Sequence, residues 1–220
     1  MGERFAYVAL LERALGDAQT VLDVGCGNNS PLGRFTRRPQ FSVGVDLHEP
    51  WLDESMQKRI HDEYRKLDVL EIDRAFGPRS FDAVLSTDLI EHLEPADGGR
   101  LLAMMERIAR RRVVILTPNG YLDQEATWGN PYQVHRSGWT PEQMRSRGYE
   151  VYGVNGLRSL RGARGQLRWR PARLWGAISD LTRPIVFCRP NRAFHILCVK
   201  ELRAVEAVDA TAAAEEQAPA

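Results

Sequence analysis

The sequence predicts an α/β fold in which a mostly parallel, Rossmann-like sheet is covered by helices on both faces. Short runs rich in apolar and β-branched residues alternate with helical patterns along most of the 220 residues. Several of these runs are almost wholly apolar, as strands buried on both faces must be. The length suits one domain, which we expect over residues 1–200.

Seven candidate strands follow one another along the chain. They are residues 20–24 (TVLDV), 41–46 (FSVGVD), 64–68 (YRKLD), 81–86 (FDAVLS), 112–117 (RVVILT), 149–154 (YEVYGV) and 194–200 (FHILCVK). Candidate helices lie before and between them, at residues 3–15, 31–37, 52–60, 99–109 and 141–147. Pro31 and Pro141 each follow a serine or threonine, the usual order of an N-cap and a first helical residue.

Two segments near the C-terminus depart from this alternation. Residues 155–193 form a long insert before the last strand, with glycines, prolines and one weak helical pattern at 171–181. From residue 201 onward the chain is mostly Ala and Glu with almost no large apolar residues. We expect residues 201–220 to be disordered.

Bulk composition argues against several functional classes. Lys and Arg total 30 against 29 Asp and Glu, so the whole chain has no general attraction for nucleic acid. The three cysteines form no CxxC pair. No apolar run reaches the roughly 18 residues of a membrane span, and the N-terminal segment resembles an amphipathic helix instead of a secretory signal. We expect a cytoplasmic protein.

The first candidate strand leads into a loop with two glycines, Gly25 and Gly27. Glycines allow a ligand to approach the backbone N–H groups of a loop. Asp46 ends the next strand, where a carboxylate can accept both hydroxyls of a ribose. Folds that bind dinucleotides and folds that bind S-adenosylmethionine share this arrangement. Ser30, followed by Pro31, occupies the third position of the dinucleotide fingerprint, which disfavours NAD.

The blocks LDVGCG, GVD, EHL and TPNG occur in this order, and in them the chain resembles the class I S-adenosylmethionine-dependent methyltransferases from about Ala6 to Val199. The resemblance implies S-adenosylmethionine as cofactor and a seven-stranded sheet whose last strand is antiparallel. It implies cofactor-binding roles for Asp23, Gly25, Cys26, Gly27, Asp46, Leu47, Asp68, Val69 and Asp88.

The resemblance also assigns parts of the cofactor to particular residues. Asp23 and the two loop glycines would surround the methionine part, and Asp46 would bind the ribose. Asp68 would accept a hydrogen bond from the adenine amine, with Val69 behind the ring. Asp68 could instead be a helix N-cap. Asp23 could be a structural residue of the turn, although a carboxylate at the end of an apolar strand needs a partner.

An acidic and histidine-containing segment follows the fourth candidate strand, with Asp88, Glu91 and His92 in STDLIEHL. His92 and the later His135 are candidate general bases for a hydroxyl acceptor. Together these residues are similar to the ExxEH-plus-His set of small-RNA 2′-O-methyltransferases, which hold a magnesium ion. Asp88 replaces the first glutamate of that set, and its shorter side chain disfavours an intact metal site, although two histidines and two carboxylates could still bind a divalent ion. Acidic residues near a helix start also have a purely electrostatic explanation.

The insert is strongly basic. Six arginines and no acidic residue occur between residues 157 and 179, interleaved with Trp169 and Trp175. A phosphate-bearing substrate or an anionic membrane surface would suit this pattern, and nucleic acid is a weaker candidate. A solvated face with no partner explains it equally well.

These observations predict a methyltransferase that acts on a hydroxyl of a small-molecule, saccharide, lipid-linked or phosphorylated acceptor. The segment after the fourth strand is not of the NPPY type that amino-directed nucleic-acid methyltransferases place there. The alternative is a methyltransferase-like protein that binds the cofactor or a partner without turnover.

Overall fold

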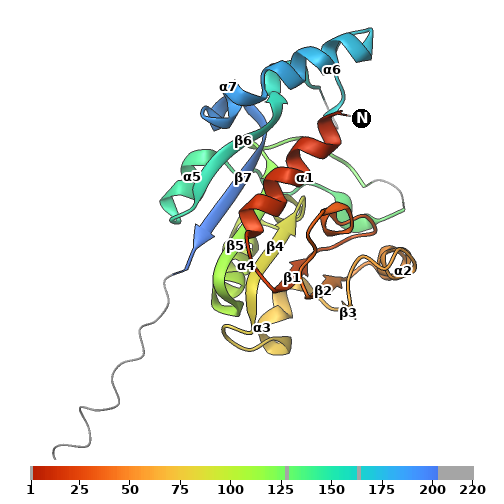
Figure 1. Cartoon of the computed structure of the whole chain (residues 1–220), viewed down its shortest axis with the longest axis vertical. Helices are drawn as coiled ribbons and strands as arrows, with labels where there is room; N and C mark the ends of the chain where they lie inside the picture. Colours follow the sequence, from red (N-terminus) through yellow and green to blue (C-terminus); the bar gives the residue numbers. More distant parts are fainter. Residues whose placement is uncertain (1, 127–128, 163–164, 203–220) are drawn as a thin grey trace, which may run out of the picture.

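A computed structural model of the chain describes residues 2–126, 129–162 and 165–202. The strands form a seven-stranded sheet in the order β3-β2-β1-β4-β5-β7-β6 (Figure 1). Their bounds are β1 Thr20–Val24, β2 Phe41–Asp46, β3 Glu63–Lys66, β4 Phe81–Thr87, β5 Ala109–Pro118, β6 Glu150–Leu157 and β7 Ala193–Glu201. All pairs among β1 to β5 are parallel, whereas β7 pairs antiparallel with both β5 and β6. The predicted Rossmann-like sheet with an antiparallel last strand is confirmed.

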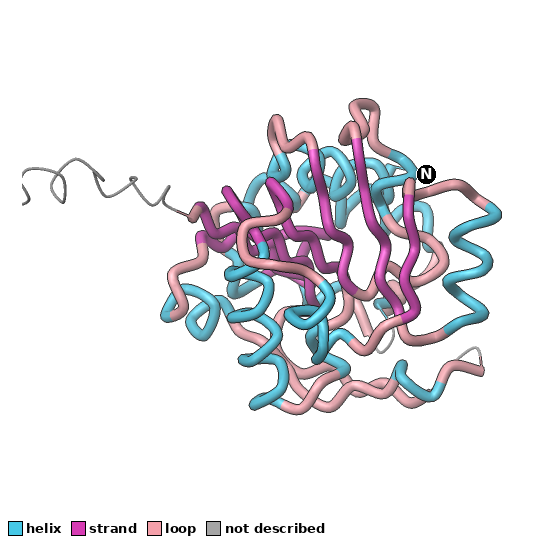
Figure 2. The backbone as a smooth tube through the Cα atoms, turned by 90° about the horizontal axis from the view of Figure 1, so that it is seen from below, coloured by secondary structure: helices cyan, strands magenta, loops and turns pink. Residues whose placement is uncertain are grey.

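Helices lie on both sides of this sheet (Figure 2). They are α1 Gly2–Leu15, α2 Glu49–Gln57, α3 Ile72–Ala75, α4 Pro95–Ile108, α5 Pro141–Ser146, α6 Ala172–Leu181 and α7 Arg183–Phe187. The helices predicted at 52–60 and 99–109 begin earlier, because Pro50 and Pro95 fit the first helical turn. The short helices α3 and α7 were not predicted.

The helix predicted over residues 31–37 is wrong. Ser30 caps a single 3-10 turn at Pro31–Arg34, and Phe35 already has extended backbone angles. Gly33 inside the turn and Pro39 just beyond it both disfavour continuation of a helix. Ser30 and Pro31 therefore do begin a helical turn, but the residues after it do not continue the helix.

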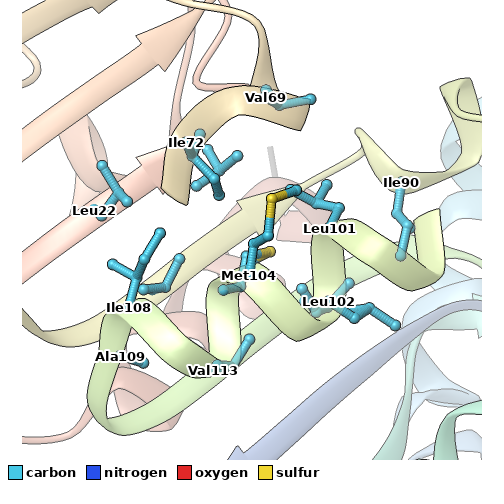
Figure 3. Packing of buried hydrophobic residues seen from close by; sticks show 14 of the residues in the cluster. Leu22, Val69, Ile72, Ile90, Leu101, Leu102, Met104, Ile108, Ala109 and Val113 are labelled. Carbon is cyan, nitrogen blue, oxygen red and sulfur yellow. The ribbon is translucent and has the colours of Figure 1, made fainter. Parts of the chain in front are cut away.

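The core has two layers because neighbouring strand residues point to opposite faces of the sheet. Leu22 packs in the layer that contains α4, whereas Val21 packs in the layer beneath α1. Figure 3 shows Leu101 and Ile108 of α4 packed in the first layer, close to Ile72. These apolar contacts fix the sheet and therefore the loops at the carboxyl ends of its parallel strands.

The structure describes most of the insert predicted at residues 155–193 but almost none of the tail predicted at 201–220. Residues 155–193 contain the end of β6, helices α6 and α7, and the start of β7. The disorder predicted for 201–220 lies outside the described residues, apart from Glu201 in β7 and Leu202. Among the described helices, none combines the length and apolar character that crossing a membrane requires.

Candidate active site

The loop after β1 is held against the end of β2. Gly25 and Gly27 have φ angles of +70° and +54°, which side-chain-bearing residues rarely adopt. A Cβ on Gly25 would lie 2.6 Å from a methyl carbon of Leu89. The N–H groups of Gly25 and Cys26 donate to the Val45 carbonyl at 2.8 and 3.0 Å. Both glycines are thus required by the path of the backbone.

Asp46 joins this loop to the sheet and also faces a cavity. Its Oδ2 accepts a hydrogen bond from the Gly27 N–H, and its Oδ1 accepts one from the His48 N–H, both at 2.8 Å. Burial raises the pKa of Asp46, and the two backbone hydrogen bonds oppose that rise. Each carboxylate oxygen retains a second lone pair. Asp46 can therefore accept ligand hydroxyls without releasing the loop.

The cavity beside Asp46 has a volume of about 410 Å³, within the range of roughly 300–1,000 Å³ typical of small-molecule sites. The predicted residues that border it are Gly25, Cys26, Gly27, Asp46, Leu47, Asp68, Val69, Asp88 and His92. Trp51 of α2 also borders it and was not predicted. Its position soon after Asp46 in the sequence is a signal that could have identified it.

Asp68 is the N-cap of a 3-10 turn and also borders the cavity. Its Oδ1 accepts a hydrogen bond from the Leu70 N–H at 2.9 Å, which makes Asp68 the N-cap of the 3-10 turn Val69–Glu71. The residue also borders the cavity. Because the cap uses Oδ1, the second oxygen is left for a ligand.

The sequence placed Asp23 beside the methionine part of the cofactor, but in the structure its carboxylate contacts two protein side chains. Its side chain is fully buried and does not border the cavity. Oδ2 accepts a hydrogen bond from the Ser30 hydroxyl and lies 2.9 Å from Nε2 of buried His61. No hydrogen-bond partner among the described residues reaches Oδ1. The geometry therefore makes Asp23 an anchor for the glycine loop instead of a wall residue of the cavity.

Replacing Asp23 with alanine should lower the free energy of unfolding by roughly 1 to 3 kcal/mol, because it leaves buried polar groups of Ser30 and His61 unpaired. Urea unfolding measures this change. Asp53→Ala is the matched control, since Asp53 is exposed on α2 and should change stability by less than about 0.5 kcal/mol. Equal midpoints for the two variants would contradict the anchoring role.

Two acidic residues converge after β4. Asp88 has a left-handed φ of +50°, and its N–H donates to the Leu116 carbonyl at 2.8 Å. Glu91 is only 2% exposed and accepts a hydrogen bond from the Thr117 hydroxyl at 2.9 Å. Burial, together with the neighbouring Asp88, raises the pKa of Glu91 well above its ordinary value. A strained backbone beside a buried carboxyl group is typical of a functional site.

The structure brings the two predicted histidines together. The rings of His92 and His135 meet edge to face, with centroids 4.8 Å apart. Nδ1 of His92 lies 3.1 Å from the Val134 carbonyl, and Nδ1 of His135 lies 2.6 Å from the Leu122 carbonyl. Carbonyls only accept, so each Nδ1 carries a proton and each neutral ring keeps a lone pair on Nε2. His92 borders the cavity, whereas His135 is buried outside its wall.

The ring of His92 should titrate below the ordinary histidine pKa of about 6.5, because burial lowers its pKa. The unfolded chain then binds the extra proton first as the pH falls, so the contribution of His92 to stability declines below about pH 6.5. NMR titration of the ring C–H signals in metal-free buffer, with the urea-unfolded chain as reference, measures the shift. A folded-state midpoint at or above the reference would contradict it.

A third histidine, His195 of β7, joins the site and was not predicted. Its Nε2 lies 3.4 Å from Oδ1 of Asp88. The side-chain amide of Asn155 donates to its Nδ1 at 3.0 Å. The proton of neutral His195 is therefore on Nε2 and faces Asp88. Only the antiparallel register, which pairs His195 with Pro118, reveals this neighbour.

Glu91, His92 and His135 also form a possible donor set for a divalent metal. One ligand atom from each lies within 4.8 Å of the others. Histidines whose Nδ1–H is held by a backbone carbonyl, with Nε2 left open, have the usual orientation of metal ligands. Asp88 is outside this set, so the four-residue site considered from the sequence reduces to three residues.

Comparisons with known proteins find a matching family model and a related sequence. Residues 22–117 match a family model described as "Methyltransferase domain". Over 103 residues the chain is 30% identical to a ubiquinone biosynthesis O-methyltransferase of Hahella chejuensis (strain KCTC 2396); the match covers 45% of this chain and 42% of that protein. The chain thus spans less than half the length of this curated relative.

Solved structures share the fold at low sequence identity. A SAM-dependent methyltransferase from Archaeoglobus fulgidus aligns with a TM-score of 0.57 and 18% identity, covering 91% of this chain and 95% of that one. Magnesium protoporphyrin IX methyltransferase from Synechocystis PCC 6803, solved with bound SAM, aligns with a TM-score of 0.51 and 14% identity, covering 90% and 77%.

Proposed function

We propose, from the premise that this chain carries a class I methyltransferase domain with S-adenosylmethionine as its methyl donor, that it methylates a hydroxyl oxygen of a small-molecule acceptor. The observation that carries the proposal is His92. Its lone pair on Nε2 is unengaged by Val134, and the residue borders the cavity together with Asp46 and Asp68. A neutral imidazole in this place can take a hydroxyl proton.

The residues around the cavity fit the cofactor. Asp46 keeps acceptor capacity for ribose hydroxyls, and Asp68 keeps one oxygen for an amine such as that of adenine. The loop from Gly25 to Gly27 has no side chain large enough to block approach to its backbone. When bound, S-adenosylmethionine supplies an electrophilic methyl group on a sulfonium sulfur. The carboxylates and the loop would hold it without any rearrangement of the sheet.

His92 would act as the general base for the acceptor. Nε2 of His92 would take the hydroxyl proton while the acceptor oxygen bonds to the methyl carbon and the methyl–sulfur bond breaks, with S-adenosylhomocysteine as the leaving group. The Val134 carbonyl keeps the ring in the required tautomer. Asp88 lies on the same cavity wall and favours the imidazolium that results. Positioning by the cavity would supply much of the remaining rate enhancement.

One observation supports an oxygen acceptor, and a second bears on its charge. The curated relative is named as an O-methyltransferase. The segment between β5 and α5 contributes Tyr132, Gln133 and Arg136 to the cavity wall, and a guanidinium there suits an acceptor that carries a carboxylate or phosphate. Arg136 is paired with Glu94 of the same wall at 3.6 Å, so both neutral saccharide alcohols and lipid-linked or phosphorylated alcohols belong in the first acceptor screen.

The proposal is tested by incubating the protein with S-adenosylmethionine and a panel of these alcohols, with matched amines, and by quantifying S-adenosylhomocysteine. Turnover with an alcohol and none with its amine analogue is expected. Turnover only with amines would contradict oxygen as the accepting atom. Tight cofactor binding without turnover on any member of a broad panel would favour the non-catalytic alternative.

A second candidate is that Glu91, His92 and His135 hold a divalent cation that assists the acceptor, which is favoured by their grouping and by the Nδ1-to-carbonyl contact that orients each ring. This candidate predicts Mn²⁺ binding by the wild type, measured by electron paramagnetic resonance, and its loss in both Glu91→Gln and His135→Ala. His195→Ala is the matched control because His195 lies outside the three-residue set. Metal-independent turnover in EDTA would eliminate this candidate.

A further inference from the structure

Helices α6 and α7 carry an apolar stripe that faces solvent. Leu174, Leu181 and Ile185 are 54%, 78% and 52% exposed. Their spacing of seven and then four residues places them on one side of the helix, and only Thr182 separates α6 from α7. The other side packs against the protein through Ser179 and Val186, which are fully buried. Figure 1 shows both helices at the outer edge of the molecule.

Arginines flank this stripe with almost no acidic residues to balance them. Arg168, Arg170 and Arg173 are exposed. Within the described ranges, Arg170 and Arg173 form no ion pair. Asp180 is the one acidic residue in the sequence from 157 to 192, and it is paired with Arg183. The surface therefore has a local excess of positive charge although the whole chain is close to neutral.

An aromatic pair lies at the start of the same surface. Trp169 is 44% exposed and its ring lies 4.7 Å from that of Trp175. Tryptophan, arginine and exposed leucine together are the residues of helices that lie in a lipid–water interface. The rings and aliphatic side chains enter the acyl boundary, while guanidinium groups contact lipid phosphates.

We propose that this insert face, formed by residues 168–187, binds the surface of a membrane that contains anionic phospholipids. The positive charge of the face favours an anionic membrane over a second copy of the chain. A second copy of the chain would place two arginine-rich faces against each other, and their repulsion opposes pairing. A single-stranded nucleic acid would satisfy the arginines but would leave Leu181, 78% exposed, in water.

The insert face lies at the same edge of the sheet as the candidate active site. The segment that leads from the carboxyl end of β6 into this face begins with Arg158, which donates hydrogen bonds to the carbonyls of Asn119 and Tyr121 at 2.5 and 3.1 Å. Those residues follow β5, next to the loops that border the cavity. Membrane binding does not depend on methyl transfer, so the two proposals stand or fail separately.

Sedimentation of the full chain with vesicles tests the proposal without any methyl acceptor. The wild type should bind vesicles of phosphatidylcholine mixed with phosphatidylglycerol, should not bind pure phosphatidylcholine, and should bind less as salt rises. Leu181→Glu and Arg170→Glu should each lower the partition coefficient by roughly tenfold. Met56→Glu on α2 and Arg74→Glu on α3 are matched controls, since both side chains are exposed far from this face.

Several outcomes would overturn the proposal. Equal partitioning of the wild type and the two test variants, or no binding of the wild type to anionic vesicles, would refute it directly. A dimer in analytical ultracentrifugation that Leu181→Glu dissociates would assign the face to self-association. Tight binding of a single-stranded oligonucleotide that Arg170→Glu abolishes and Leu181→Glu does not would assign it to nucleic acid. Circular dichroism of each variant confirms that it is folded.

Discussion

Replacing His92 with alanine is expected to lower the kcat of methyl transfer by roughly 10²- to 10⁴-fold, the usual contribution of a general base. The affinity for S-adenosylhomocysteine should stay within a factor of two to three of wild type, about the scatter of a surface substitution. Cofactor affinity should be nearly unchanged because His92 is not one of the residues expected to hold the cofactor. His92 lies with the acidic and histidine cluster, whereas Asp46 and Asp68 belong to the glycine-loop side. Steady-state kinetics and calorimetry on the same preparations measure the two quantities.

His135→Ala is the informative comparison for this result. It removes the imidazole that contacts His92 but does not border the cavity. A general-base role predicts a smaller loss in His135→Ala and partial rescue of His92→Ala by added imidazole. Equal losses in both variants, restored by neither imidazole nor buffer base, would contradict the role of His92 as base and would favour the shared cation.

Replacing Asp46 with alanine is expected to weaken cofactor binding by roughly 1 to 3 kcal/mol, about a five- to 150-fold increase in Kd. The carboxylate accepts the Gly27 N–H and still faces the cavity. Its removal would cost both the ligand hydroxyl bonds and the anchor of the loop. Calorimetric titration with S-adenosylhomocysteine measures the change.

Two further variants show whether the loss arises from the carboxylate itself. Asp46→Asn keeps one acceptor oxygen and should bind with intermediate affinity. Asp53→Ala, on exposed α2 surface, should bind as wild type does. Unchanged affinity in Asp46→Ala would mean that the ribose of the cofactor lies elsewhere.

The sequence was sufficient to predict the sheet and to bring Asp46, Asp68 and the glycine loop to one edge of it. Apolar runs identified the strands, and residues at the carboxyl ends of adjacent parallel strands must meet at one edge. Asp46 at the end of β2 and Asp68 just beyond β3 therefore border one cavity with the loop that follows β1. This placement needed only strand order and direction.

Other parts of the site could not be predicted, because they depend on the direction of single side chains. Asp23 is one residue from the end of β1 yet does not border the cavity, and its carboxylate contacts His61, which lies 38 residues later in the chain. His195 reaches Asp88 only through the antiparallel register of β7. Alternation along a strand constrains which face a side chain occupies, but the face alone does not name its partner.

Calorimetric titration of the wild-type chain with S-adenosylmethionine, S-adenosylhomocysteine and NAD is the most direct test that this cavity is an S-adenosylmethionine site. We predict one saturable site per chain for both sulfur compounds and no binding heat with NAD. Saturable binding of NAD, with no response to S-adenosylmethionine or S-adenosylhomocysteine, would contradict the central claim.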